Sequence, residues 1–468
     1  MIKLKLFKSI IHILLCLGPT SYIVLSLGET FLDDAYITLT YSKHFFEHGK
    51  PWYNLVDTLQ GNGQTSILWM LIQSVFFVFK DSDHVILNKI IGIILSLIFI
   101  YELKLLIDKN ICNKFSLIFI SLFTFFFSFW LALNISHGLE TVLYAVCIFL
   151  FLKYKNTNVG SFIILILPFI RPEAIILSIF YIIDSKFFSK EFFKRILIVT
   201  ISSVIYLTYV NYFYSIMTPL PFLLKNTANF NLTKVRNFIT IVIIFLPIIS
   251  YTFKNFSKKS IIYFPLFFFI VYYSFFIDEV MNMFDRYRFP LIGYYLYFLL
   301  YEDTKVFKNN YLVITFSAFA ILFYCNSLID QKNYYKYSYS PGMINGPIFL
   351  GKYFKKESSI ANNKKFNIIN CDAGAIAYFS ECNLYDDFGL NNATLLLAKK
   401  QNNWSIYLEY LKKTDPDYII LISLYEDKYE EYLDFEKRIY DFFLLKNKKP
   451  VVIRKFEDNY YYFVYKIK

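Results

Sequence analysis

This sequence has few charged residues, few histidines and no pair of cysteines with the spacing of a metal site. Each of these features excludes a class of protein. Charged residues make up 18% of the 468 residues, against about 25% in soluble domains, so the chain is not an ordinary soluble protein. With only 5 histidines, a zinc site built on histidine is not expected. The 6 cysteines contain no Cys-x-x-Cys pair, which argues against a cysteine-bound metal.

Hydrophobic residues account for 56% of the chain and aromatic residues for 21%. Charge is sparse before residue 330 and dense after it, which predicts a membrane domain over 1–330 and a polar domain over 331–468. The net charge of +12 does not indicate a nucleic-acid partner, because Lys and Arg cluster in short loops between apolar runs. That placement is the positive-inside pattern of a membrane protein.

About 20 apolar residues are needed to cross a hydrocarbon core of about 30 Å. Single spans are predicted at 9–27, 85–107, 115–133, 140–154, 196–214, 237–253, 260–277, 288–302 and 310–328. A cleaved signal peptide ending near Gly28 is the alternative for the first of these. The apolar run 67–79 is too short to cross the membrane, and we expect it to form an interfacial helix.

Residues 161–183 are interrupted by Pro168 and by Arg171-Pro172-Glu173. Proline removes a backbone donor, and charges at mid-membrane are costly unless they face protein or water. We therefore expect a broken helical hairpin with its tip at the outer face. The hairpin and the single spans together give about 11 crossings, with the first outer loop over 28–84 and an extracytoplasmic C-terminal domain.

This topology gathers the polar residues of the membrane domain at the outer face. They are Asp33, Asp34, Glu140, Arg171, Glu173, Lys225, Asp285, Arg286 and Arg288. Convergent charges at one membrane face indicate a site. His137, by contrast, is expected to be a packed or capping residue.

The adjacent carboxylates Asp33 and Asp34 have three interpretations. They form part of an ordinary solvated loop or helix N-cap, they bind a hard divalent cation, most directly through Asp34, or one of them is a general base. A glycine-rich turn shaped by Gly61, Gly63, Thr65 and Ser66 would let the chain pass close to them, because glycine tolerates tight turns and close backbone approach.

The cationic side chains of the outer face suit an anionic group. Arginine matches phosphate through its bidentate fork, which favours phosphate binding by Arg171, Arg286 and Arg288, with Lys225 beside them. The alternative is that each of these side chains reaches toward the lipid head groups.

The C-terminal part predicts a small mixed α/β sheet. Strands are expected at 366–371 and 418–423, a helix at 404–413, and a terminal hairpin of 451–455 with 460–465 across Asp458-Asn459. Cys371 and Cys382 could form a disulfide in an oxidising compartment, or remain two unpaired thiols.

Several short motifs occur in a fixed order along the chain. They are Phe31-Leu32-Asp33-Asp34-Ala35-Tyr36-Ile37, Gly49-Lys50-Pro51-Trp52-Tyr53-Asn54, Gly61-Asn62-Gly63-Gln64-Thr65-Ser66, Gly138-Leu139-Glu140-Thr141, Arg171-Pro172-Glu173, Pro219 to Lys225, Arg286-Tyr287 and Asp372-Ala373-Gly374 followed by Asp387-Phe388-Gly389. Together they resemble the GT-C glycosyltransferases, and within them the group of the mycobacterial terminal arabinofuranosyltransferases. Ser136-His137 and the Gly61–Ser66 turn depart from the usual pattern of that group, which affects the identity of the acceptor.

The resemblance implies an integral protein of the bacterial cytoplasmic membrane that transfers one sugar, with inversion, from a polyprenyl-phosphate donor to a cell-envelope glycan or glycolipid on the outer face. Asp33 or Asp34 would be the base and the arginines would steady the lipid phosphate, with Glu140 and Glu173 in the substrate-binding set. No cofactor is implied with certainty, and a divalent cation is an option. The alternatives are a glycan ligase or polymerase, and a lipid or polysaccharide transporter.

Overall fold

The computed structural model describes residues 20, 22–24, 26–27, 30–79, 83–109, 114–225, 231–254, 258–277, 282–301 and 311–468. Most of the first predicted span, 9–27, therefore lies outside the described residues. The chain divides into two compact units, and each is described by itself. Unit 1 comprises Met1–Gly28, Val85–Tyr206 and Asn226–Lys332, and unit 2 comprises Glu29–His84, Leu207–Lys225 and Asn333–Lys468. The boundary near residue 330 stays a prediction, since each unit is assembled from several segments.

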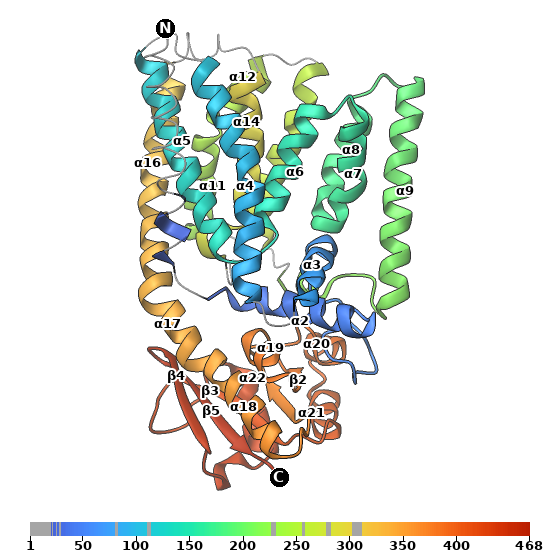
Figure 1. The fold of residues 1–468 in the computed structure, drawn as a ribbon, viewed down its shortest axis with the longest axis vertical. Helices are drawn as coiled ribbons and strands as arrows, with labels where there is room; N and C mark the ends of the chain where they lie inside the picture. Colours follow the sequence, from blue (N-terminus) through green and yellow to red (C-terminus); the bar gives the residue numbers. More distant parts are fainter. Residues whose placement is uncertain are drawn as a thin grey trace. The chain divides into compact units, whose positions relative to one another are not determined.

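The first unit is helical (Figure 1). The helices that lie in it wholly or in large part are α4 (His84–Lys109), α5 (Lys114–Ser136), α6 (Thr141–Tyr154), α7 (Asn158–Ile170), α8 (Ile175–Ile183), α9 (Lys190–Phe213), α11 (Leu232–Ile244), α12 (Leu246–Lys254), α13 (Phe264–Val271), α14 (Ile292–Tyr301) and α16 (Tyr311–Tyr334). Within the described residues, 4 helices are long and apolar enough to cross a membrane, or 5 if the bent pair α11 and α12 counts as one span. The total of about 11 crossings stays a prediction.

The α11–α12 pair differs from the single straight span predicted at 237–253. The two helices meet at Phe245 with a bend of 63°. Pro247 lies in the first turn of α12 and has no backbone N–H to donate to the preceding turn. A proline at this place is a sufficient cause for a sharp kink.

The helix that includes α16 does not end near residue 328, as the sequence predicts. It continues as one helical segment over Val313–Ile360, through α17 (Ser340–Met343) and α18 (Phe349–Ile360). Two π-helical stretches, Tyr335–Tyr339 and Ile344–Ile348, interrupt its α-helical geometry. Proline lacks the N–H that an α-helix interior requires, and a π segment supplies a different hydrogen-bond pattern, so Pro341 and Pro347 do not end the helix.

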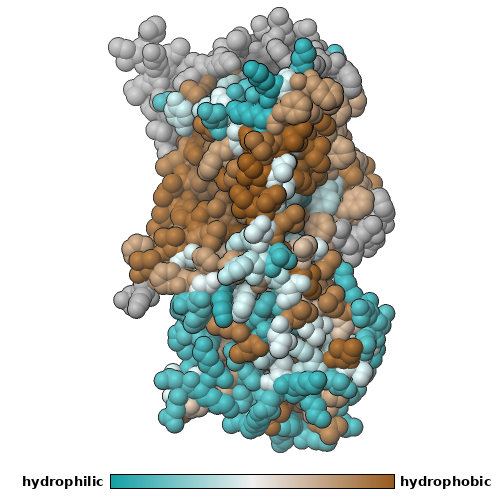
Figure 2. All heavy atoms as spheres, turned by 90° about the vertical axis from the view of Figure 1, so that its right-hand side faces the viewer, coloured by the Kyte–Doolittle hydropathy of each residue, from teal (hydrophilic) through white to brown (hydrophobic). Residues whose placement is uncertain are grey.

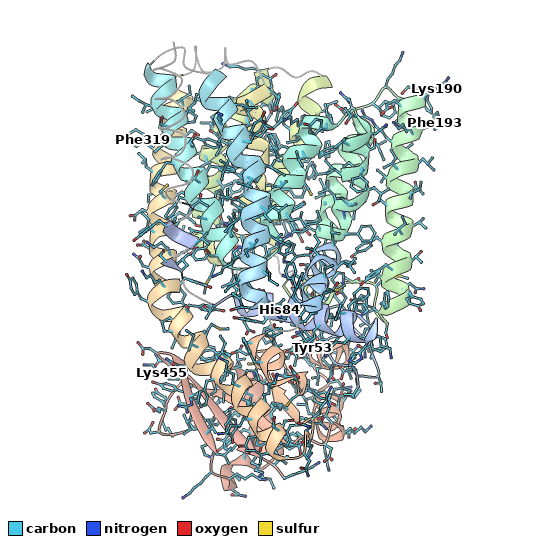
Figure 3. All side chains as sticks on the ribbon, viewed as in Figure 1. Tyr53, His84, Lys190, Phe193, Phe319 and Lys455 are labelled. Carbon is cyan, nitrogen blue, oxygen red and sulfur yellow. The ribbon has the colours of Figure 1, made fainter. Side chains whose placement is uncertain are left out.

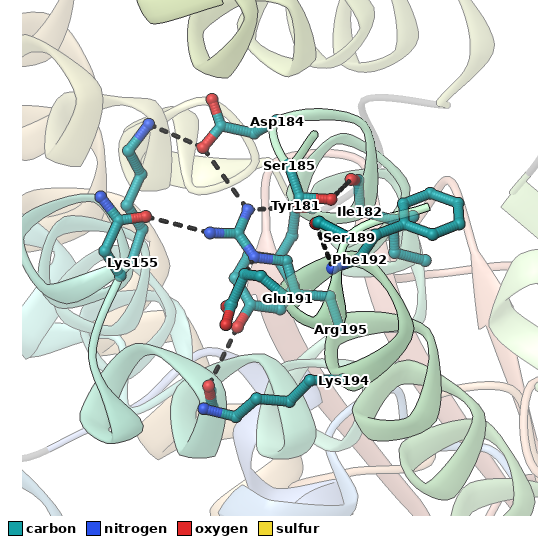
Figure 4. Close-up of polar contacts among 12 residues, drawn as sticks. Lys155, Tyr181, Ile182, Asp184, Ser185, Ser189, Glu191, Phe192, Lys194 and Arg195 are labelled. Carbon is teal, nitrogen blue, oxygen red and sulfur yellow. Dashed lines mark hydrogen bonds and ion pairs between the residues drawn. The ribbon is translucent and has the colours of Figure 1, made fainter. Parts of the chain in front are cut away.

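The segment from 158 to 183 is a broken helical hairpin, as predicted. After α7 the chain makes a short 3-10 turn over Pro172–Ala174 and enters α8. The open ends of the hairpin are joined by ion pairs (Figure 4), with Lys155 Nζ 2.9 Å and Arg195 Nη1 3.5 Å from Asp184 Oδ2. The basic loops on either side of the hairpin therefore lie at the same end of this unit.

The α9 helix exposes apolar side chains along its length. Phe193, near Lys190 in its first turn (Figure 3), is 56% exposed, and Leu197 and Val204 are 59% and 56% exposed. Hydrophobic atoms cover most of the helical unit on the face drawn in Figure 2, whereas the sheet-bearing unit is mainly hydrophilic there. An apolar surface of this extent is expected of helices that face lipid.

The second unit contains a five-stranded mixed sheet in the order β2-β1-β3-β5-β4. Its strands are β1 (Asn367–Asn370), β2 (Asn383–Asp386), β3 (Tyr418–Ser423), β4 (Val452–Glu457) and β5 (Tyr460–Lys466). β1 pairs in parallel with β2 and β3, and β5 pairs antiparallel with β3 and β4. The predicted strands and the β4–β5 hairpin are confirmed, and β2 is an additional strand.

Short helices complete this unit. They are α2 (Asp33–His48), α3 (Ile67–Ser74), α10 (Leu220–Lys225), α19 (Ala375–Ser380), α20 (Ala393–Lys400), α21 (Trp404–Lys413) and α22 (Asp434–Phe442). The α3 helix and the 3-10 turn after it cover Ile67–Val78, so this segment is a short apolar helix, as predicted. Its interfacial position stays a prediction. Ile369, Leu395, Ile419, Leu421 and Phe463 lie in the buried core around the sheet.

Two adjacent buried carboxylates at the end of β2, Asp386 and Asp387, differ in their surroundings. Asp386 accepts hydrogen bonds from the Asn391 N–H at 2.7 Å, the Asn391 side-chain amide at 3.0 Å and the Gly389 N–H at 3.2 Å. Asp387 is fully buried, and neither of its carboxylate oxygens has a hydrogen-bond partner among the residues that the structure describes. Burial raises the pKa of Asp387 well above its ordinary value and that of Asp386 to about 6.

We expect the Asp387→Asn variant to be more stable than the wild type at pH 8 and nearly equal to it at pH 4. A carboxyl with a raised pKa binds more protons in the folded than in the unfolded state. The stability that Asp387 contributes by binding this proton is therefore fully present below about pH 4. It is lost as the pH rises toward the pKa that Asp387 has in the folded protein. Thermal unfolding of the full chain in detergent at both pH values measures the difference.

Asp386→Asn is the matched control. It replaces an acceptor of three hydrogen bonds, and the loss of a satisfied buried acceptor costs about 1–3 kcal/mol, so this variant should unfold at a lower temperature. A decrease in the unfolding temperature of Asp387→Asn at pH 8 would contradict the assignment of Asp387 as an unsatisfied carboxyl.

Candidate functional site

Asp33 and Asp34 lie in the first turn of a helix, so of the two local settings predicted for them, a solvated loop and a helix N-cap, the structure has them at a helix N-terminus. They are the first two residues of α2, and the helix ends at Gly49, which has a φ of 66°. Carboxylates are favoured in the first turn because the helix dipole is positive there. A left-handed glycine is a common C-terminal cap.

The Asp33 carboxylate holds the turn that begins α19. Its Oδ2 accepts the Gly374 N–H at 2.8 Å and its Oδ1 accepts the Ala375 N–H at 2.8 Å. The Asp33 side chain is buried, with the residue 7% exposed. A Cβ atom placed on Gly374 would lie 2.1 Å from the Asp33 carbonyl oxygen and 2.5 Å from its carboxyl group. Glycine is therefore required at 374 by the close approach.

The same two segments are joined by further contacts. The Tyr53 hydroxyl, on a side chain labelled in Figure 3, donates to the Ala373 carbonyl oxygen. The Asp33 N–H donates to the Tyr339 hydroxyl at 3.0 Å. The Tyr335 hydroxyl donates to the Thr30 carbonyl oxygen at 2.8 Å. The start of α2 is thus fixed by side chains of the π-helical stretch 335–339 and by the turn at 373–375.

Asp372 is a third carboxylate of this group, and it was not among the predicted site residues. Its Oδ2 accepts the Tyr460 hydroxyl at 2.8 Å and also the Tyr462 hydroxyl. Asp372 follows the carboxyl end of β1, which has parallel neighbours on both sides. Ligands of open parallel sheets bind outside the carboxyl ends of the strands, and this position was the signal available in the sequence.

Burial raises the pKa of Asp33 to about 8, and the negative charges of Asp372 and Asp34 act in the same direction. The Ala375 and Gly374 N–H groups oppose this shift. Burial also raises the pKa of Asp372, against the hydrogen bonds from Tyr462 and Tyr460. Clustered carboxyl groups with perturbed pKa values are typical of functional sites.

The glycine-rich turn is held by α2. The Tyr41 hydroxyl donates to the Gly61 carbonyl oxygen at 3.3 Å and accepts the Gly63 N–H at 2.8 Å. The atoms nearest to a Cβ built on Gly63 belong to Asn391 and Leu390, and those nearest to one on Gly61 belong to Leu220 and Ala393. The closest contacts of these glycines are therefore not with Asp33 and Asp34, as predicted, but with the 390–393 segment and α10.

The other residues of the turn have local roles. Ser66 caps α3 by accepting the Trp69 N–H at 3.3 Å, and Thr65 is half-buried just before it. Gln73 in α3 is fully buried, and within the described part of the chain neither atom of its amide has a hydrogen-bond partner. Buried polar groups are usually paired, so this amide is a candidate for substrate recognition that the sequence did not single out.

In the first unit, Arg171 is the centre of a buried ion network. Its Nη2 lies 2.7 Å from Glu140 Oε1 and its Nη1 lies 3.3 Å from Glu173 Oε1. The Tyr273 hydroxyl donates to Glu173 Oε1 at 2.9 Å, and the guanidinium carbon lies 5.6 Å from the centre of the Tyr287 ring. The structure thus brings together three predicted site residues from the α5–α6 and α7–α8 connections.

Asp285 and Arg288 form a second pair, with Arg288 Nη1 2.7 Å from Asp285 Oδ1. Arg288 Nη2 also donates to the Tyr273 carbonyl oxygen at 3.4 Å, so Tyr273 contacts both networks. Arg286 Nη2 donates to the Tyr287 hydroxyl at 3.2 Å. Phe284 and Asp285 have φ values of 57° and 50°, a conformation that costs free energy for residues other than glycine.

Other predicted residues have simpler outcomes. His137 caps the turn before α6, since its Nδ1 accepts the Leu139 N–H at 3.2 Å. Lys225 is the last residue of α10, and its side chain lies outside the described part. Cys371 and Cys382 are free thiols.

The prediction against a histidine-built zinc site assumed that no His-x-x-x-His spacing occurs, and this was wrong, because His44 and His48 have that spacing. His44 and His48 lie one turn apart on α2, with ring centres 6.1 Å apart, and His44 Nδ1 lies 2.8 Å from the Trp52 carbonyl oxygen. Among the described residues, no group of three His, Cys, Asp or Glu side chains is placed to hold a metal ion. The cation at Asp34 stays a prediction.

We expect Arg171→Ala to be strongly destabilising, because it leaves the buried carboxylate of Glu140 and the half-buried carboxylate of Glu173 without their cation. Removing one partner of a buried ion pair costs about 3–5 kcal/mol. The control is the triple variant Arg171→Ala/Glu140→Gln/Glu173→Gln, in which neutral side chains replace the whole network and part of the stability should return. Thermal unfolding in detergent compares the two, and a single variant as stable as the wild type would contradict the network.

Comparison with known proteins identifies the fold. A family described as "Domain of unknown function (DUF8728)" matches residues 349–465, and no curated protein sequence matches the chain. Among solved structures, ArnT from Cupriavidus metallidurans, crystallised with undecaprenyl phosphate, is similar to this chain with a TM-score of 0.53 and 9% identity. The similarity covers 98% of this chain and 98% of ArnT. At this level of identity the match establishes the fold alone, so the chain has the fold of ArnT.

Proposed function

We propose that the protein is a glycosyltransferase that moves a single sugar, with inversion, from a polyprenyl-phosphate donor to a cell-envelope glycan or glycolipid. The observation that carries the proposal is the fold shared with ArnT, a GT-C glycosyltransferase crystallised with undecaprenyl phosphate, along nearly the full length of both chains. The ordered motifs of the mycobacterial terminal arabinofuranosyltransferase group support the same reaction class. The positive-inside pattern supports an active site on the extracytoplasmic face.

The reaction requires a base for the acceptor hydroxyl. In a single displacement with inversion, the hydroxyl oxygen bonds to the anomeric carbon as the bond to the lipid phosphate oxygen breaks, and the hydroxyl proton passes to the base. The carboxylates at the start of α2 are of the right type, and general base catalysis contributes about 10²–10⁴-fold.

The leaving lipid phosphate requires cationic donors. Arg171, Arg286 and Arg288 are assigned to it, with Lys225 as a further cation. Arg171 shares its charge with Glu140 and Glu173, and Arg288 with Asp285, so both guanidinium groups are held in fixed orientations. Preorganised donors of this kind stabilise developing charge without reorganisation during the reaction.

Glycan mass profiling of the cell envelope tests the function. A deletion strain should lack one sugar mass on a single envelope component, and the wild-type gene should restore it. Asp34→Asn should not restore it, because an amide cannot accept the proton. Immunoblotting of the membrane fraction confirms that the variant is present at the wild-type level.

Other outcomes would exclude the proposal. Loss of a whole polymer from the deletion strain would indicate a ligase or polymerase. Restoration of the sugar by both Asp33→Asn and Asp34→Asn would show that neither carboxylate is the base. An unchanged envelope together with an unchanged lipid-linked precursor would favour a transporter.

A further inference from the structure

The two adjacent aspartates have different tasks. We propose that Asp33 is a positioning residue that clasps the Asp372-Ala373-Gly374 turn to the start of α2, and that Asp34 is the general base. This assignment rests on the proposed function and decides between two residues that the sequence treats alike.

The hydrogen bonds of Asp33 support the clasp. Each oxygen of its carboxyl group already accepts a backbone N–H, from Gly374 and from Ala375, at 2.8 Å. These N–H groups belong to the first turn of α19, where the amides lack partners inside the helix. A proton accepted by Asp33 would compete with the bonds that hold the turn, so this carboxyl is poorly placed to exchange protons with a substrate.

The surroundings of Asp33 confirm how closely the turn is held. The approach to Gly374 leaves no space for a Cβ atom, and the Asp33 N–H is itself bound by the Tyr339 hydroxyl. Asp33 therefore has its backbone donor and both carboxyl oxygens committed to protein groups. Asp33 is 7% exposed, whereas Asp34 is only half-buried. The carboxyl group of Asp34 is therefore the more accessible of the two to an acceptor.

The clasp also places a third carboxyl beside the base. Asp372 directly precedes the clasped residues, and its charge interacts with both Asp33 and Asp34. The ionisable groups that face Asp33 come from several elements; they are Asp34, Tyr36, Tyr53, Tyr339, Asp372 and Tyr462. Most of these are tyrosines, so Asp34 and Asp372 supply the negative charge near Asp33.

If Asp33 positions the turn and Asp34 is the base, replacement by asparagine should have different effects at the two positions. An asparagine Oδ1 can still accept one of the two N–H groups, so Asp33→Asn should retain much of the activity that Asp33→Ala loses. At position 34, asparagine and alanine should be equally inactive, since neither accepts a proton. We expect a loss of about 10-fold for Asp33→Asn, about 100-fold for Asp33→Ala, as for a misplaced reacting group, and up to about 10⁴-fold for both Asp34 variants.

The assay uses full-length protein in detergent, added to a detergent extract of deletion-strain envelopes that supplies both donor and acceptor. The initial rate of the one-sugar mass increment is measured against pH. Asp33→Asn should keep the acid limb of the wild-type profile, and both Asp34 variants should lose it. Equal inactivity of Asp33→Asn and Asp33→Ala in folded protein, or wild-type activity of Asp33→Ala, would overturn the assignment.

A readout without catalysis tests the clasp separately. Cys371 and Cys382 are half-buried free thiols that flank the clasped turn and α19, while Cys147 is buried in α6. Asp33→Ala and Gly374→Ala should speed alkylation of Cys371 and Cys382, measured by mass spectrometry, and leave Cys147 and the Asp34→Asn protein unchanged. If the wild type transfers no sugar, the proposed function fails, and unchanged alkylation rates would independently overturn the clasp.

Discussion

The second unit depends on two hydrogen bonds between residues that are more than 340 positions apart in the chain. The Asp33 carboxyl group binds the amides of Gly374 and Ala375 and so fixes the first turn of α2 against a turn of the α/β sheet. Closing a loop of this length costs a large amount of conformational entropy. Several other hydrogen bonds span a similar separation in sequence, among them those of Tyr53 with Ala373 and of Tyr335 with Thr30. The polar C-terminal part is therefore not an independent appendage, because its first turn after β1 is completed by residues near the start of the chain.

Buried charge is treated differently in the two units. In the first, Arg171 is surrounded by Glu140, Glu173 and aromatic rings, so each charge has an opposite charge within reach. In the second, Asp33, Asp372 and Asp387 are buried with few cations, and desolvation raises their pKa values. Compensated charge favours a fixed geometry, which suits an oriented cation in the proposed reaction. In the second unit, the raised pKa values of Asp33 and Asp372 belong to carboxyl groups that interact with the charge of Asp34, the proposed base.

Much of the helical and strand content could be predicted from local pattern. Apolar length identified α4, α5, α6 and α9, and β-branched runs identified β3 and the final hairpin, because these signals lie within single segments. The sequence left Asp33 and Asp34 open between a solvated loop and a helix N-cap, since aspartate is favoured in both. The bend before Pro247 and the continuation of the helix past residue 328 depend on backbone hydrogen bonding that composition does not report.

The site was predictable in its residue types but not in its pairings. The carboxylates, glutamates and arginines were identified by placement and motif order, yet nothing in the sequence indicates that the Asp33 carboxyl group binds the backbone amides of Gly374 and Ala375. The sequence shows Asp372 only as part of a motif. Its position after β1, beside the tyrosine hydroxyls of β5, is what identifies it as a member of the carboxylate group. Such assignments require the contacts themselves.

The apolar surface of α9 has a consequence for work with the isolated protein. Only 11% of its apolar window is buried inside the protein, so hydrocarbon chains, and not neighbouring helices, provide most of its surroundings. The helix is thus solvated by whatever amphiphile replaces the bilayer. The length and packing of the surfactant tails will affect α9 more than the enclosed helices α5 and α6, which makes it the element through which lipid composition acts on the molecule.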